Sequence, residues 1–112
     1  MRRIALIMTF MDRIALLNEI LTQNPNDGFA RYGLALEYRK LGQVEQALTE
    51  FSRLLSANPD YTAGYFMAAQ TLADAGRTDE AKQMLTDGIA SAQRTRDAHA
   101  QSEMEAMLQD LS

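Results

Sequence analysis

The sequence predicts an all-α fold in which two stacked pairs of antiparallel helices carry one further helix at each end. Three observations lead to it: landmark residues recur 34 positions apart, apolar residues between them follow helical spacing, and glycine or proline separates the segments. A fixed period of roughly 20 to 50 residues is typical of repeat proteins, whose units bury their apolar faces against their neighbours. The two regular units therefore need the flanking helices to complete their core.

Eight positions define the repeat, because each of them has a counterpart of the same kind 34 residues later. An asparagine precedes each of the two prolines in the set. The pairs are Pro25 and Pro59, Gly42 and Gly76, Ala47 and Ala81, Tyr32 and Phe66, Ala35 and Ala69, Tyr38 and Leu72, Phe51 and Leu85, and Leu55 and Ile89. One coincidence would mean little, whereas eight in one register indicate a duplicated helix–turn–helix unit.

The first unit consists of residues 28–41 and 44–57. Both segments place apolar side chains at i, i+3 and i+4 spacings, which predicts a helix with one buried face. Gly42 follows the first segment, and glycine tolerates the positive φ that often ends a helix. Asn58-Pro59 follows the second, where proline can neither donate an N–H nor continue the helix.

The second unit is expected to begin with a helix over residues 62–75. Asp60 or Thr62 is placed to cap its start, because short oxygen-bearing side chains accept hydrogen bonds from free N–H groups there. Thr78 is expected to cap the following helix through its hydroxyl. Asp79-Glu80 come next and suit the positive first turn of a helix.

Apolar stripes also flank the two units. Residues 12–23 match the second helix of a preceding unit whose first helix is missing, and the end of the chain carries a stripe with a polar opposite face. The stripe residues are Ile14, Leu17, Ile20 and Leu21 at the first end, and Ala100, Met104, Met107, Leu108 and Leu111 at the second. A helix with one apolar and one polar side is what the end of a helical stack requires.

The pattern resembles the tetratricopeptide repeat (TPR) family. Leu34-Ala35, Tyr38, Gly42, Ala47, Phe51 and Pro59 fill the family's positions in the first unit, and Tyr65, Ala68-Ala69, Leu72, Gly76, Ala81 and Leu85 fill them in the second. Gln93 stands where the second unit would have its proline. The small residues Ala35, Ala47, Ala69 and Ala81 let helix backbones approach, so a larger side chain there should cost about 1–3 kcal/mol.

This resemblance implies a right-handed α-solenoid of antiparallel helix pairs with an N-terminal helix and a C-terminal capping helix. The expected division is residues 1–23 for the N-terminal helix, 24–58 for repeat 1, 59–93 for repeat 2 and 94–112 for the capping helix. In this family the first helices of successive units line a concave groove that holds peptides. The groove would include Phe29, Tyr32, Leu36, Arg39, Lys40, Phe66, Gln70 and Asp74.

An apolar or amphipathic peptide is the expected ligand of that groove. The family's best-known variant clamps a peptide carboxylate with Lys, Asn and Arg, whereas Tyr32, Leu36, Phe66 and Gln70 stand at comparable places here. Both aromatic residues have core packing as an alternative role. Arg39-Lys40 could contact an acidic partner, or they could be solvated residues that suit the negative end of a helix.

The chain begins with Arg2-Arg3 and an apolar run, Ile4 to Met11, of about eight residues, which is far too short to span a bilayer. A secretion signal is one interpretation, but no small-residue cleavage site follows. Two others are an apolar extension of the first helix and a natural start at Met11. If exposed, the run would favour a homo-dimer through Ile4, Ile7, Met8, Phe10 and Met11.

The composition excludes several classes of function. Apolar residues make up 46% of the chain, which is enough for a folded core, and the net charge of −4 gives no basic face for nucleic acid. Cysteine is absent, and His99 is the only histidine, in a polar segment. Neither a nucleophilic dyad nor a metal or cofactor site is predicted.

We therefore expect a cytoplasmic protein-interaction module that is not an enzyme, needs no cofactor and does not enter a membrane. The alternatives are a structural protein that self-associates through its N-terminal helix and a subunit with a dedicated partner in a larger complex.

Overall fold

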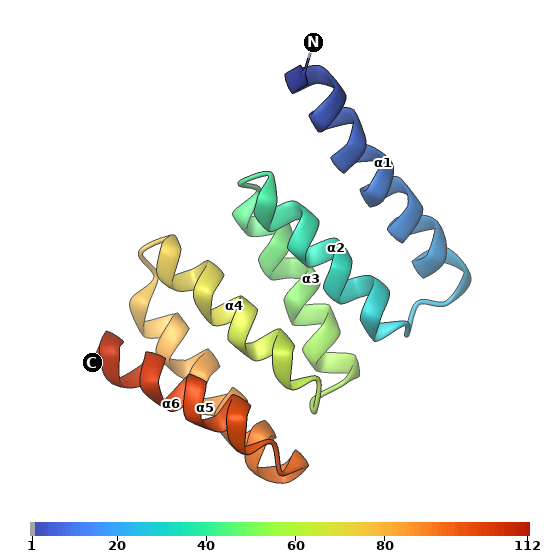
Figure 1. Ribbon diagram of the computed structural model, residues 1–112. Helices are drawn as coiled ribbons and strands as arrows, with labels where there is room; N and C mark the ends of the chain where they lie inside the picture. The colour runs from blue at the N-terminus through green and yellow to red at the C-terminus, as the bar shows by residue number, and fades with distance from the viewer. Residues whose placement is uncertain (1) are drawn as a thin grey trace.

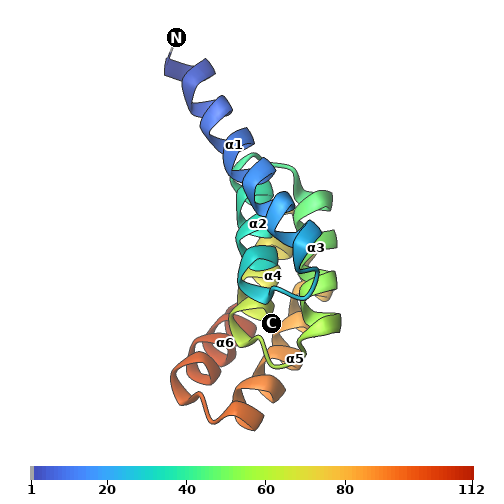
Figure 2. The ribbon, with the colours of Figure 1, turned by 90° about the vertical axis from the view of Figure 1, so that its right-hand side faces the viewer.

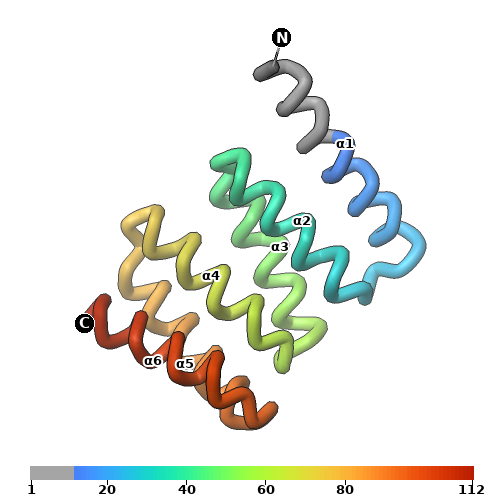
Figure 3. Tube along the Cα trace, viewed as in Figure 1, coloured from blue at the N-terminus to red at the C-terminus, as the bar shows by residue number. Residues whose placement is uncertain are grey.

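The computed structural model describes residues 2–112, with side chains described from residue 12 onward (Figure 3). The described chain forms six α-helices and no strand. They are α1 (Arg2–Gln23), α2 (Gly28–Lys40), α3 (Val44–Ala57), α4 (Thr62–Asp74), α5 (Thr78–Thr95) and α6 (Ala98–Leu111). The predicted all-α class is confirmed, and α2, α3 and α4 begin and end within a residue of the ranges expected from the repeat.

The helices are stacked in two layers. Consecutive helices pack antiparallel on one another, most extensively in the pairs α2/α3 and α4/α5. In Figure 1, α2, α4 and α6 lie side by side in front of α3 and α5, and Figure 2 shows the two layers from the side. The molecule measures 42 × 30 × 21 Å. Its two broad faces are therefore the α2/α4/α6 layer and the α3/α5 layer.

Each helix pair turns at a glycine, as the sequence predicts. Gly42 and Gly76 have φ of 75° and 77°, in the left-handed region that glycine enters without strain. The N–H of Gln43 donates to the carbonyl of Tyr38 at 3.0 Å, and the N–H of Arg77 donates to Leu72 at 2.9 Å. The same C-terminal motif thus closes α2 and α4, one repeat apart.

The predicted side-chain caps of α4 and α5 are wrong. Tyr61 and Arg77 occupy the cap positions without a side-chain hydrogen bond, so Thr62 and Thr78 are already the first helical residues. A hydroxyl within the helix cannot reach the free N–H groups that a cap residue satisfies. The Asp60 carboxylate instead accepts a hydrogen bond from the Arg94 side chain at 2.9 Å.

Two other helices do have aspartate caps. The side chain of Asp27 accepts from the N–H of Ala30, and that of Asp97 accepts from Ala100, each at 3.0 Å. These two caps begin α2 and α6, both of which lie in the same layer. Asp79 and Glu80 lie in the first turn of α5, as expected.

Small residues line the seams between the helices. Ala35, Ala47, Ala69 and Ala81 are fully buried, as the repeat pattern requires. Larger apolar residues from neighbouring helices fill the space around them in three clusters that follow one another along the stack. Their buried members are Leu21, Ala30 and Leu34; Ala35, Ala47, Phe51, Leu54 and Ala68; and Tyr65, Ala69, Leu85, Ala92 and Met104.

The two ends of the stack differ. α6 closes one end with Met104 fully buried, and the rest of its predicted stripe packs on the cluster that contains Leu85. At the other end Ile14, Leu17 and Leu21 of α1 pack on α2. Ile20 departs from its predicted role in the apolar stripe, because it remains 36% exposed.

Candidate functional site

The predicted groove residues all lie on the α2/α4/α6 layer. Phe29, Tyr32, Leu36 and Arg39 come from α2, and Phe66 and Gln70 come from α4. Phe29 is 79% exposed, and the others are half-buried. The structure thus places these six side chains on two neighbouring helices, with an aromatic ring exposed at the start of α2.

Tyr32 both packs in the core and lines the surface. Its ring meets Phe51 edge-on with centroids 6.4 Å apart, and it meets Tyr61 at 5.3 Å. Burial raises the pKa of Tyr32, and the nearby Tyr61 raises it further. The same ring lines a hollow of about 150 Å³ together with Phe66 and residues of α6 such as Ala100. Of the two roles drawn from the sequence, core packing is therefore observed for Tyr32, and peptide contact stays a prediction.

A polar hollow of about 250 Å³ lies further along the same layer, between the ends of α2 and α4. The Arg39 guanidinium spans it to reach the Asp74 carboxylate at 3.2 Å. The Lys40 ammonium lies 3.6 Å from Glu37 on its own helix. Both predicted cations thus have carboxylate partners within the chain, and both also lie in the last turn of α2.

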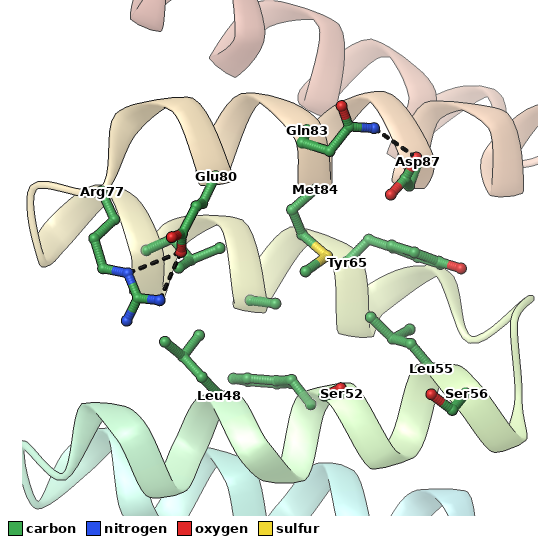
Figure 4. A pocket seen from close by; sticks show the side chains of 13 residues that line it. Leu48, Ser52, Leu55, Ser56, Tyr65, Arg77, Glu80, Gln83, Met84 and Asp87 are labelled. Atoms are coloured by element: carbon green, nitrogen blue, oxygen red, sulfur yellow. Dashed lines mark hydrogen bonds and ion pairs between the residues drawn. The ribbon is translucent and has the colours of Figure 1, made fainter.

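A larger hollow lies on the opposite layer and was not predicted. It has a volume of about 510 Å³ between α3 and α5, with α4 as its floor (Figure 4). A signal for it exists in the repeat, since Leu34 and Tyr38 of the first unit become the smaller Ala68 and Leu72 in the second. Smaller floor residues leave space beneath the two walls.

The five residues proposed for self-association, Ile4, Ile7, Met8, Phe10 and Met11, lie outside the residues whose side chains the structure describes. Exposed apolar side chains do occur nearby on α1, where Leu16 is 58% exposed. Self-association therefore stays a prediction.

Metal-binding groups do not come together in the described part of the chain. His99 is 84% exposed at its side chain, and its Nε2 lies 2.9 Å from the Glu103 carboxylate one helical turn away. Within the described residues, no group of three or more His, Cys, Asp or Glu side chains could hold a metal ion. Nor does any described helix have the length and apolar character needed to cross a membrane.

Comparison with known proteins decides the family. The family model described as tetratricopeptide repeat matches residues 38–104, which is more than half of the chain. The chain belongs to the tetratricopeptide repeat family. The match spans the second helix of the first unit, the whole second unit and the first half of α6, so the family's pattern extends into the capping helix of this TPR chain.

Relatives of this TPR chain support the assignment. A TPR repeat-containing protein of Pseudomonas aeruginosa is 28% identical over 95 residues, which cover 85% of this chain and 90% of the relative. A tetratricopeptide repeat domain protein of Salinibacter ruber, solved by NMR, is 29% identical with a TM-score of 0.75 over 80% of this chain and 90% of that one.

One further solved structure shares the fold at lower identity. It is the Yersinia enterocolitica type III secretion chaperone SycD in complex with a peptide of the translocator YopD. The TM-score is 0.82 at 18% identity, over 96% of this chain and 82% of that one. The likeness extends over nearly the whole TPR chain, flanking helices included.

Proposed function

We propose that this TPR chain is a protein-interaction module that holds an apolar or amphipathic peptide on its α2/α4/α6 layer. The observation that carries the proposal is that Tyr32 and Phe66, one repeat apart, line a single hollow on this layer. SycD, which shares the fold, is solved with a peptide of another protein. The cysteine-free composition supports a reducing compartment, and we place this function in the cytoplasm.

The side chains of this layer favour a ligand that is apolar in its middle and polar at its ends. Phe29, Tyr32 and Leu36 follow one another at i, i+3 and i+7 on α2, so their side chains share a face of the helix. The Arg39–Asp74 ion pair lies toward one end of this strip, and Glu103 borders the hollow on α6. An amphipathic peptide could cover the aromatic rings and leave its own polar residues beside these charges.

Phe29 is the groove residue whose solvent exposure a bound peptide would reduce most. Covering an exposed phenylalanine side chain contributes about 1.5–3 kcal/mol, which is roughly a tenfold to hundredfold effect on affinity. Because Phe29 is 79% exposed, its replacement should leave the fold intact. Tyr32 is less suitable, since its ring also supports Phe51.

The test starts from peptides selected on the wild-type chain by display. We expect their affinity to fall at least about tenfold for Phe29→Ala and for Phe66→Ala. Leu16→Ala is the matched control, because Leu16 is also an exposed apolar residue but lies on α1. Selected peptides that bind both aromatic variants as tightly as wild type would place the ligand elsewhere and overturn the proposal. The same result for the double variant Tyr32→Ala/Phe66→Ala, checked for folding, would do so too.

A further inference from the structure

A second surface with binding character lies on the opposite layer. We call it the α3/α5 trough, and Figure 4 shows it from close by. Leu48 and Leu55 of α3 form one wall, Met84 of α5 forms the other, and Ala68 and Leu72 of α4 form the floor. Leu48 and Leu55 are seven residues apart. The apolar wall therefore extends about 10 Å along the helix, which is enough for two side chains one turn apart.

The equivalent place one repeat earlier, around Tyr38 and Glu50, shows that the chain itself can fill such a trough. Glu50 is the counterpart of Met84 one repeat earlier, and it is held by Arg31 at 2.7 Å and by Arg53 at 2.9 Å. Tyr38 stands there in place of Leu72. The hollow left beside Tyr38 and Glu50 is about 300 Å³, against about 510 Å³ in the α3/α5 trough. The α3/α5 trough lacks an equivalent tyrosine and an equivalent group of ion pairs.

The rim of the trough carries an excess of negative charge. Arg77 is the only cation among the described side chains that line it, and its guanidinium lies 2.6 Å from Glu45 and 2.7 Å from Glu80. Asp87 lies further along the rim and accepts a hydrogen bond from the neutral Gln83 amide at 3.1 Å. Two carboxylates, Glu80 and Asp87, therefore line the trough with one guanidinium, so an apolar ligand with flanking cations is the chemical match.

The chain itself carries a segment of that chemistry. Residues 2–11 begin with two arginines and continue with Ile4, Leu6, Ile7, Met8, Phe10 and Met11. α1 begins at Arg2, and Ile7 and Phe10 are spaced by one helical turn. We propose that the N-terminal segment of a second copy docks in the α3/α5 trough, with apolar side chains against Leu48, Leu55 and Met84 and its arginines beside Glu80 and Asp87.

This interface is distinct from the peptide site. The peptide site lies on the α2/α4/α6 layer and the trough on the α3/α5 layer, so the two can be occupied at once. If each of two copies gives its segment to the other, the contact closes as a dimer. If only one segment is given, the chains add head to tail.

Cysteine chemistry provides a direct test, because the natural chain contains no cysteine. Ser52 lines the trough and is exposed, so one full-length chain carries Ser52→Cys. A second, isotope-labelled chain carries Thr9→Cys. After mixing and mild oxidation, we expect mixed disulfide dimers, identified by mass. The control replaces Ser52→Cys with Ser112→Cys at the exposed end of the chain, and we expect much less mixed dimer from it. Equal yields from the two pairs would overturn the proposal.

Charge reversal tests the same contact in solution by sedimentation across a concentration series. Glu80→Arg/Asp87→Arg and Arg2→Glu/Arg3→Glu should each weaken self-association about tenfold, and the quadruple variant should restore it. Glu105→Arg/Asp110→Arg makes the same change in net charge on α6 and should leave association unchanged. A wild-type chain that stays monomeric throughout, or rim reversal that behaves like the α6 control, would overturn the proposal. If a variant lost peptide binding but still self-associated, the result would bear only on the proposed peptide site and not on this interface.

Discussion

The Arg31 guanidinium lies 2.7 Å from the Glu50 carboxylate and joins α2 to α3, at the position where the second repeat has Tyr65 and Met84. The two charged side chains are only 15% and 9% exposed. Arg31 also donates to the carbonyl of Pro25 at 3.0 Å. One scaffold position is thus filled by a shielded ion pair in the first unit and by an aromatic and a methionine in the second.

This relationship predicts a non-additive pair of substitutions. Glu50→Met alone should destabilise the fold by about 3 kcal/mol, because it leaves the Arg31 guanidinium shielded without its carboxylate. Arg31→Tyr/Glu50→Met installs the residues of the second repeat and should come within about 1 kcal/mol of wild type. Urea unfolding measures both. Glu45→Gln, which weakens the exposed pair with Arg77, is the control and should change stability by less than about 1 kcal/mol. Equal losses for the single and double variants would contradict the prediction.

A second prediction concerns the close approach of helices at Gly88. A Cβ on this residue would lie 2.5 Å from the Met104 sulfur and 2.6 Å from Tyr65 Cβ. Gly88→Ala should therefore cost about 1–3 kcal/mol, even though alanine favours helix more than glycine does. At Gly33 the nearest atom to a Cβ is 3.5 Å away, in Leu17. Gly33→Ala should instead stabilise by about 0.5–1 kcal/mol. Thermal unfolding of both variants tests the contrast, and a shared sign would contradict it.

The helix boundaries could be predicted from the sequence because they depend on local backbone chemistry. Gly42 and Gly76 adopt the positive φ expected of them, and Asn58-Pro59 ends α3. Where the second proline is missing, at Gln93, the helix continues to Thr95. The cap at Thr78 was wrong because a shift of one residue at a helix start changes which group faces the free N–H groups.

The surfaces were harder to predict than the helices. The sequence places Tyr32 on the first helix of its unit, but its packing on Phe51 depends on the distance between two helices. The α3/α5 trough depends on the sizes of Ala68 and Leu72 relative to Leu34 and Tyr38, which a pattern of apolar positions does not distinguish. Periodicity reports which side is buried, whereas a hollow depends on how completely that side is filled.

A third prediction follows from the end of α5. Arg96 has φ of 57°, a left-handed conformation in which side chains are strained, and it is the only such residue other than glycine in the described chain. Arg96→Gly should therefore stabilise the fold by about 1 kcal/mol. Gly76→Ala is the reverse test, because an added Cβ there would meet nothing within 4 Å and the cost would be conformational alone. It should destabilise by about 1 kcal/mol. Urea midpoints that move in the same direction would contradict this account.

The fourth prediction concerns alkaline pH. Burial is the main cause that raises the pKa of both Tyr32 and Tyr61 above the ordinary value of 10.0. Above about pH 10 the unfolded chain loses these phenolic protons while the folded chain still holds them. The contribution to stability is therefore complete below pH 10 and is lost as the pH rises through the folded-state pKa values.

Tyr32→Phe should flatten this loss, because it keeps the ring against Phe51 and removes the ionisable hydroxyl. The free energy of unfolding, measured by urea at steps from about pH 8 to about pH 11, should fall less steeply than in wild type. Tyr65→Phe provides the contrast. Burial also raises the pKa of Tyr65, but its hydroxyl donates to the carbonyl of Pro59 at 2.7 Å. This variant should lose about 1 kcal/mol at neutral pH as well. An unchanged alkaline slope in Tyr32→Phe would contradict the prediction, because it would show that the phenol of Tyr32 is no less hydrated in the fold than in the unfolded chain.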